Sequence, residues 1–410
     1  MALVRRFACL LVFTLPIVLD AQQPQPPLTA LTFDTALAFA TGRNLRVDAA
    51  RRQRAIREAG VRTAGQIPNP DLSGEASRDV PHQAINFDVP LEIGGKRSRR
   101  VDLAREELSL AETDVQVELR ALRRQLREAF YSLIAANDRV RLSENALEIA
   151  TRLRDIAQAR FDAGAVPRLE VLQAELGVAR AQTDLDLVRS LQTSFRATLN
   201  GVLNLSPDQP TDITGSLADH TASTPSYDEA RRIALASNID LLSLDRQAAV
   251  ETRRTELLRA ERTPTPIFTI GALFNAPGEF GVGPRFGVSM GVPLFSRNQG
   301  EIAGSMATAA QLRAQRAAEE RTIENALFGT IARIQAQRQR TIAYTQRLVP
   351  TAIDLESLAE ESYRAGRTSV LNVLDAQRTV RDVRDEALQA ALDLQTSVAE
   401  LEELLGIAVQ

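Results

Sequence analysis

Two stretches of the sequence share one pattern: residues 160–174 read RFDAGAVPRLEVLQA and residues 362–376 read SYRAGRTSVLNVLDA. In each stretch an Ala-Gly pair interrupts a helical pattern that continues for dozens of residues. Glycine at a helix end adopts the left-handed conformation that other residues adopt only at a steric cost. Gly164 and Gly366 therefore predict the turns of two helical hairpins. The stretches lie 202 positions apart in a chain of 410 residues, which predicts one structural unit used twice.

Other matches between the two halves support an internal duplication. Val-Pro-Leu at 89–91 recurs at 292–294, and Asn44-Leu45 is matched by Asn238-Ile239. Matches about 200 positions apart indicate one supersecondary unit used twice. We expect a first repeat over residues 22–205, a linker over 206–226 that is rich in Pro, Asp, Thr and Ser, and a second repeat over 227–410.

Heptad spacing predicts very long helices. From Val101 to Ala157, small or apolar residues recur every seven positions, as in the seam of a coiled coil. The expected helices cover 96–162 and 168–205 in the first half, and 297–363 and 368–407 in the second. At about 1.5 Å per residue the first of them is about 100 Å long. Taken alone, this periodicity favours a structural coiled coil.

Four short segments have the alternating pattern of strands. Apolar side chains alternate with polar or small ones from Ile85 to Ile93 and from Phe286 to Leu294. The expected strands cover about 69–77, 84–93, 265–274 and 284–294, in two hairpins. A repeat of two over about ten residues, with one wholly apolar face, is typical of strands in membrane barrels. Hairpins on a soluble sheet are the alternative.

The alternation predicts which side chains face lipid: Phe87, Val89, Phe286, Val288 and Met290. Four strands cannot close a barrel, because small membrane barrels use about eight and open edges are unsatisfied in lipid. Oligomerisation is therefore required. The expected shape is a barrel continued by a helical tube.

Composition excludes several classes of protein. The net charge of −3 argues against nucleic-acid binding, and one Cys with two His leaves no usual set of ligands for a metal. Lys96 is the single lysine, and no phosphate-binding loop or catalytic motif is present. We expect no enzyme activity, no cofactor and no metal site. Residues 1–21, with Arg5 and Arg6 before an apolar core, are predicted to be a signal peptide.

The stretch from Tyr363 to Gln377, together with the duplication, the hairpins and the Val-Pro-Leu junctions, resembles the TolC-like outer membrane efflux proteins. The resemblance covers nearly all of the mature chain. It implies a mixed α and β membrane protein: a homotrimer with a 12-stranded barrel, four strands per chain, continued by a coiled-coil tunnel. It places the protein in the outer membrane of a Gram-negative-type cell, extending into the periplasm.

The function implied by this resemblance is that of a passive exit duct in a tripartite efflux or type I secretion system. A periplasmic membrane-fusion adaptor and an inner-membrane transporter would open it at its periplasmic tip. The alternative is an exported periplasmic coiled-coil scaffold or adaptor protein that does not enter lipid. The sequence leaves the exported substrate, the class of pump and the state of the gate open.

The resemblance also implies roles for residues at the tip. Gly164 and Gly366 match the turns where the adaptor docks. Asn372 and Asp375 match acidic positions that constrict the lumen, although Asn372 departs from the acidic pattern. Three copies of a carboxylate around a narrow axis would attract cations.

A second group of tip residues matches the contacts that hold the family's gate closed. Tyr363 and Arg367 occupy the places of a Tyr and an Arg that bond a carboxylate of the other hairpin, here Glu170. The remaining arginines nearby are interpreted as solvated side chains on a helix face: Arg378, Arg381 and Arg384.

Overall fold

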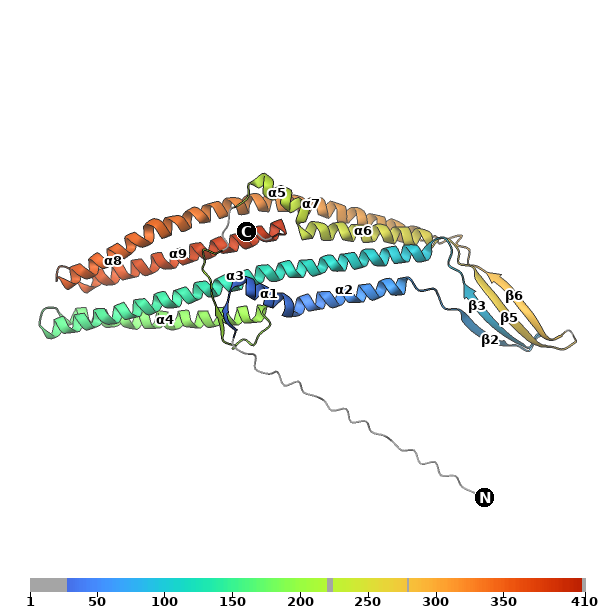
Figure 1. Ribbon diagram of the computed structural model, residues 1–410, viewed down its shortest axis with the longest axis horizontal. Coiled ribbons are helices and arrows are strands. Elements are labelled where there is room, and N and C mark those ends of the chain that lie inside the picture. The colour runs from blue at the N-terminus through green and yellow to red at the C-terminus, as the bar shows by residue number, and fades with distance from the viewer. Residues whose placement is uncertain (1–27, 220–223, 279, 408–410) are drawn as a thin grey trace, which may run out of the picture.

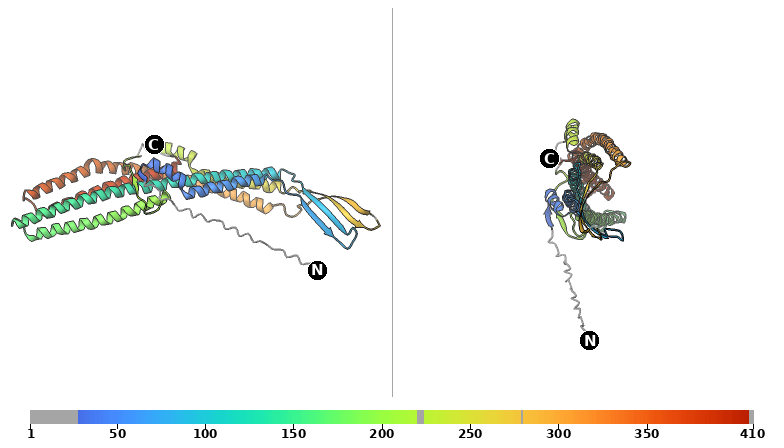
Figure 2. Two further views of the ribbon diagram at one scale, coloured as in Figure 1. Left: turned by 60° about the horizontal axis from the view of Figure 1, so that its bottom comes forward. Right: turned by 90° about the vertical axis from the view of Figure 1, so that its right-hand side faces the viewer.

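The structure, a computed structural model, describes residues 28–219, 224–278 and 280–407. The molecule is elongated, with a four-stranded sheet at one end and two helical hairpin tips at the other (Figure 1). Two further views show the same long, narrow shape (Figure 2). No helix in the described part of the chain combines the length and apolar character needed to cross a bilayer. The predicted signal peptide, 1–21, lies outside the described residues.

The helices run along the long axis, and the second half of the chain repeats their order. The first half contains α1 (Phe33–Arg43), α2 (Leu45–Ala64), α3 (Lys96–Asp162) and α4 (Arg168–Val202). The second contains α5 (Tyr227–Ser237), α6 (Ile239–Ala260), α7 (Gln299–Ala343), α8 (Val349–Arg364) and α9 (Val370–Leu405). Helix α3 packs against α2 and α6 toward the sheet and against α4 and α9 toward the tip.

The sheet combines the strands of both halves. Its order is β2 (Asp71–Ala76), β3 (Gln83–Pro90), β5 (Ile267–Ala276) and β6 (Phe280–Ser289), and every pairing is antiparallel. The two hairpins join where β3 pairs with β5. Within the described residues, β2 and β6 are edge strands, each with one unpaired side.

The prediction for the last strand was wrong at both ends. Residues 284–294 were expected, whereas β6 runs from Phe280 to Ser289. Met290 therefore lies beyond the strand and not on its face. Pro293 offers no N–H to a strand ladder, and the chain turns instead toward α7.

The predicted linker, 206–226, contains a strand. Residues Thr211–Ile213 form β4, which pairs in parallel with β1 (Leu28–Leu31). Thr211 is buried, and its hydroxyl group lies 2.7 Å from the side-chain oxygen of Asn200 at the end of α4. Nδ2 of Asn200 lies within hydrogen-bond distance of three carbonyl oxygens of the following turn, which share its two N–H donors, so this segment is fixed to the helical body.

The second long helix is interrupted where a continuous helix over 297–363 was expected. Tyr344–Leu348 form one π-helical turn between α7 and α8. Pro350 is the second residue after this turn, and a proline has no N–H for the bond to the residue four positions earlier, while its ring clashes with that carbonyl. Helix α3 has no proline and stays α-helical throughout.

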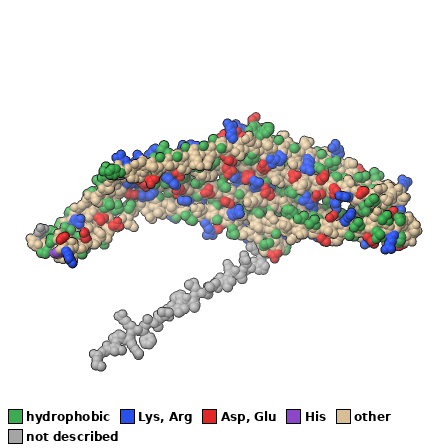
Figure 3. Space-filling model, turned by 180° about the vertical axis from the view of Figure 1, so that it is seen from behind, with side chains coloured by type: hydrophobic (Ala, Val, Ile, Leu, Met, Phe, Trp, Pro, Cys, Tyr) green, Lys and Arg blue, Asp and Glu red, His purple; other side chains and the backbone are tan. Residues whose placement is uncertain are grey.

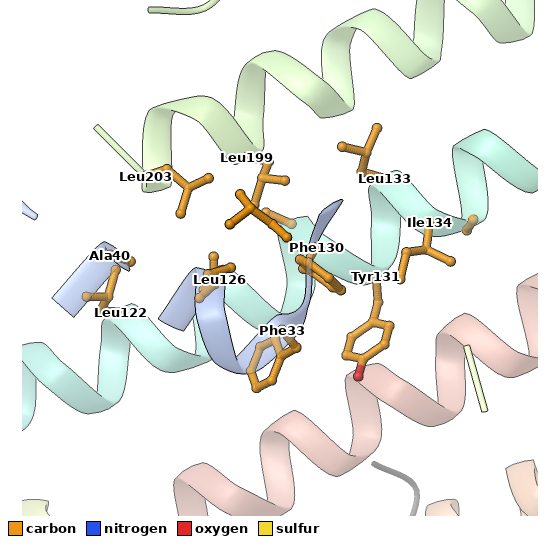
Figure 4. Close-up of a cluster of buried hydrophobic side chains, with 14 of the residues drawn as sticks. Phe33, Ala40, Leu122, Leu126, Phe130, Tyr131, Leu133, Ile134, Leu199 and Leu203 are labelled. Carbon is orange, nitrogen blue, oxygen red and sulfur yellow. The ribbon is translucent and has the colours of Figure 1, made fainter. Parts of the chain in front are cut away.

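A hydrophobic cluster at mid-length fixes α1 and α4 to α3. The ring of Phe33 lies 5.8 Å from that of Phe130 and 6.0 Å from that of Tyr131, centroid to centroid. Leu126 and Leu199 are fully buried beside them (Figure 4). Burial raises the pKa of Tyr131 to about 12, so its hydroxyl group stays neutral.

A buried arginine joins this cluster to α9. The Arg127 guanidinium donates to the side-chain oxygen of Gln395 at 2.9 Å and lies 3.0 Å from a carboxylate oxygen of Glu402. The Gln395 amide in turn donates to the carbonyl groups of Leu217 and Asp219. One polar network therefore connects α3, α9 and the segment after β4.

The two halves use equivalent asparagines to close equivalent helix ends. Asn44 caps α2 and its amide donates to the carbonyl of Val202 at the end of α4. Asn238 caps α6 and its amide donates to the carbonyl of Leu404 in the last turn of α9. Each asparagine satisfies orphan groups of two helices.

Replacing Arg127 with alanine should lower the free energy of unfolding by about 1–3 kcal/mol, because buried Gln395 loses its donor, while Glu402 retains the guanidinium of Arg123 at 3.2 Å. Urea unfolding followed by circular dichroism measures the change. Arg152→Ala is the matched control on the same helix, since its ion pair with Glu148 is exposed. The control should cost about 0.5 kcal/mol or less. Equal losses would contradict a stabilising buried network.

Candidate functional site

The two hairpin tips have the same backbone geometry. Gly164 and Gly366 both have φ of 72°. At each tip the glycine N–H donates to the carbonyl three residues earlier, and the next N–H donates to the carbonyl five residues earlier. No side chain or backbone atom would touch a Cβ added at Gly164, so the backbone angle alone requires glycine there.

A small hydrophobic cluster joins the two hairpins just above the tips. It has members from α3, α4, α8 and α9: Leu153, Ala157, Ala174, Tyr363, Val370 and Val373. Each of these side chains is buried. The hairpins are thus held together by packing, with Tyr363 as the largest member.

Tyr363 connects α8 to both helices of the other hairpin. Its hydroxyl group donates to a carboxylate oxygen of Glu170 at 3.4 Å. Burial, followed by the negative charge of Glu170, raises the pKa of the Tyr363 phenol. The sequence resemblance predicted that these two residues belong to one site, and the structure places them in contact.

Arg160 is a member of this site that sequence reasoning missed. Its guanidinium lies 4.7 Å from the centre of the Tyr363 ring, and its Nη1 donates to the Tyr363 carbonyl at 3.3 Å. A cation over an aromatic face contributes about 0.5–2 kcal/mol. The available signal was its position one helical turn before Gly164.

Arg367 is not brought to Glu170 within the chain. It is exposed in the turn after α8, and among the described residues it forms no hydrogen bond or ion pair through its side chain. Its predicted contact with Glu170 of a neighbouring hairpin therefore stays a prediction.

Asn372 and Asp375 lie on an exposed face of α9. They are three positions apart and so share one side of the helix, while Val373 and Ala376 are buried. Asp375 lines a groove between α4 and α9, where the helices approach closely: a Cβ at Gly177 would lie 3.1 Å from Leu374. That the side chains of Asn372 and Asp375 face a lumen stays a prediction.

Arg381 was interpreted as a solvated side chain, and it is partly exposed but also forms an ion pair. Its Nη1 lies 2.6 Å from a carboxylate oxygen of Asp184, which joins α9 to α4 above the tip. Arg378 pairs within its own helix, with Asp382 at 3.7 Å. Elsewhere on the helical body, charged side chains of both signs are interspersed (Figure 3).

Among the residues that the structure describes, none form a group of three or more His, Cys, Asp or Glu that could hold a metal ion.

At the other end of the molecule, the strand register produces one apolar face. Leu72, Phe87, Ile270 and Phe286 are aligned across the four strands. All four side chains are exposed, Phe286 by 76% and Leu72 by 74%. Val89, Phe268 and Val288 form the next row and are also exposed.

The opposite face of the sheet is polar or small. Asp71 is aligned with Asp88, and Asp88 with Thr269, whose hydroxyl group donates to the Asp88 carboxylate at 2.5 Å. Gly287 follows on β6. Exposed apolar surface of this extent, backed by a polar face, marks an interaction with a partner or a membrane.

This chain is similar in sequence to two proteins of known name and similar in fold to a solved structure. It is 26% identical over 389 residues to the cobalt-zinc-cadmium resistance protein CzcC of Cupriavidus metallidurans, covering 93% of this chain and 92% of that protein. It is 28% identical over 379 residues to the pyoverdine export outer membrane protein OpmQ of Pseudomonas putida, covering 87% and 76%. The fold is similar to the crystal structure of CusC, with a TM-score of 0.76, 16% identity, and coverage of 94% and 96%.

The model of one protein family matches most of the chain, over residues 36–205 and 284–407. These ranges include the helices α2, α3, α4, α7, α8 and α9 and both tips, together with β2, β3 and most of β6. The chain belongs to the outer membrane efflux protein family.

Proposed function

We propose that three copies of this chain form a closed outer-membrane duct, continued by a helical tunnel into the periplasm. The duct is passive, and a periplasmic adaptor with an inner-membrane transporter opens it at the hairpin tips. The observation that carries the proposal is a four-stranded sheet with two unpaired edges and one apolar face. Three such sheets provide a barrel of 12 strands.

The unpaired edges of the sheet must pair with strands from other copies of the chain. In the hydrocarbon layer each unpaired N–H or C=O costs several kcal/mol, so only closed barrels and helices cross it. Pairing β6 of one copy with β2 of the next removes all free edges. It also turns the aligned apolar rows outward to lipid and leaves Asp71 and Asp88 in the aqueous lumen.

The tips supply the gate in this proposal. The hydroxyl to carboxylate distance of 3.4 Å between Tyr363 and Glu170 exceeds the usual range of about 2.5–3.0 Å, so this bond is weak. The cation–π contact of Arg160 and the small apolar cluster each add a modest free energy that holds the hairpins together. A weakly held tip can open when an adaptor binds near Gly164 and Gly366. Asp375, repeated three times, would favour cations at the entrance.

The proposal covers the duct and leaves its cargo open. The relatives that are 26% and 28% identical to this chain are named for cobalt-zinc-cadmium resistance and for pyoverdine export. An exported scaffold that stays outside lipid is the alternative, and the exposed apolar rows of the sheet disfavour it.

The barrel is tested with one matched pair of substitutions on β5. Unheated wild-type protein from outer membranes should migrate in SDS gels as a trimer, and heated protein as a monomer. Ile270→Arg places a charge on the lipid face and should cost about 2–4 kcal/mol near the midplane, which reduces trimer recovery. Thr269→Arg should be tolerated, because it faces the lumen beside Asp88. Equal recovery for the two variants would reject the barrel.

The contact around Tyr363 is tested by single-channel recording in planar bilayers. Arg160→Gln removes the cation over the ring and the bond to the Tyr363 carbonyl, so it should raise the conductance of the closed duct. Tyr363→Phe removes one weak bond and should act less. Arg364→Gln is the control, since among the described residues Arg364 pairs with Glu360 of its own helix and with no residue of the other hairpin. A control that raises conductance as much would refute the gate at this position.

A contact between neighbouring copies is tested by exchanging charges. If Arg367 of one copy bonds Glu170 of the next, the bond contributes about 1.5–3 kcal/mol, less where water screens it. Arg367→Glu should then raise conductance. The double variant, with Arg367→Glu and Glu170→Arg together, should conduct less than either single variant. Unchanged conductance in an assembled Arg367→Glu trimer would exclude this contact.

A further inference from the structure

We propose that Arg259, Arg262 and Arg297, with the N-terminus of α7, bind the phosphate headgroups of anionic phospholipids in the periplasmic leaflet of the outer membrane. The inference rests on the proposed function, since it requires the sheet to lie in lipid. It adds a lipid-binding surface at the junction between the sheet and the helices.

These arginines lie where two chain segments pass between sheet and helices. Arg259 is in the last turn of α6, Arg262 lies between α6 and β5, and Arg297 lies just before α7. Figure 1 shows α6 and α7 meeting the sheet at the same level of the long axis. The apolar rows of β5 and β6 end at this level, so the arginines border the lipid-facing surface.

The three guanidinium groups bond only neutral acceptors in the described chain. Nε of Arg262 donates to the carbonyl of Arg297 at 2.8 Å, and Nε of Arg297 to the carbonyl of Pro293 at 3.1 Å. Nη2 of Arg259 lies 3.7 Å from the sulfur of Met306. All three residues are exposed. These bonds orient the side chains and leave the positive charge without a carboxylate partner.

Two other arginines at the same junction are neutralised. Arg99 lies 2.8 Å from a carboxylate oxygen of Glu256, and Arg100 lies 2.7 Å from one of Glu92. Glu261 and Glu301 are the acidic neighbours of the three arginines in sequence, and neither pairs with them among the described residues. Arg97, on the α3 side, is exposed and donates to the carbonyl of Gly65 at 2.6 Å. Among the described residues, three exposed arginines without a carboxylate partner therefore lie on the α6 and α7 side of the junction and one on the α3 side.

Two further features of this side suit a membrane interface. Val292, Leu294 and Phe295 follow β6 and are exposed, Phe295 by 92%. Apolar side chains beside cations are typical of residues that reach acyl chains and phosphates together.

The start of α7 adds positive electrostatic potential to the same place. Asn298 at its N-cap makes no side-chain bond to the helix, so the cap side chain does not occupy the first N–H groups. A helix N-terminus attracts phosphate through these groups and the helix dipole. Together with the arginines and the apolar loop, it forms a surface that complements an anionic lipid.

The test uses purified full-length trimer in mixed lipid with spin-labelled phosphatidylglycerol or phosphatidylcholine. Electron spin resonance compares how strongly each lipid associates with the protein. Wild-type protein should prefer phosphatidylglycerol, and 0.5 M NaCl should weaken the preference. Replacing all three arginines with glutamine should remove about fivefold in association per arginine. The control replaces Arg51, Arg232 and Arg313, which are exposed on the helical body and unpaired among the described residues, with glutamine.

Several outcomes decide the proposal. Loss of the preference in the junction variant, with retention in the control variant and in a triple lysine variant, supports it. Wild-type protein without a preference for phosphatidylglycerol overturns it, and so does an equal loss of that preference in both glutamine variants. It is also overturned if the junction variant forms fewer trimers but the remaining trimers keep the wild-type lipid preference. If the junction variant fails to assemble, Arg262→Gln alone should give the fivefold decrease. Wild-type protein that forms no membrane trimer would instead refute the proposed function.

Discussion

The apolar seam of α3 is the interaction on which the rest of the structure depends. Toward the sheet it contacts α2 and α6, and toward the tips it contacts α4 and α9, so elements of both halves pack on one helix. At mid-length the buried Arg127 replaces apolar packing with directed bonds to Gln395 and Glu402. Those bonds have angular requirements that sliding helices cannot satisfy, so they fix the register of α9 along α3. The position of the tips and of the sheet follows from that register.

The seam and the strands could be predicted because both are periodic. Heptad spacing indicated the long helices, and alternation from Ile85 to Ile93 indicated one apolar face. What sequence reasoning missed is not periodic. The strand at Thr211 pairs with a distant segment, the turn at Tyr344 results from the proline that follows, and Met290 falls beyond a strand end. At the tip, resemblance identified Tyr363 and Glu170, but the cation–π contact of Arg160 depends on three-dimensional proximity between hairpins.

The distribution of strong and weak contacts along the molecule suits an efflux duct. The middle is fixed by aromatic packing and by ion pairs with little exposure to water, whereas the tips are joined by one small cluster and a long hydrogen bond. Contacts of low total energy can be exchanged without unfolding the body. Between these regions, the ion pair of Arg381 with Asp184 joins α9 to α4, so a movement of the tip that separates these helices must break it.

The pairing of β3 with β5 determines when the sheet can form. Phe87 meets Ile270 only after most of the chain has been made, and closing so long a loop is slow compared with forming helices. During that interval the hairpin of β2 and β3 presents a half-apolar ribbon with a free edge to water. Such ribbons associate with other strands. The first hairpin therefore stays open to pairing with strands of other chains until β5 has been made and has paired with β3.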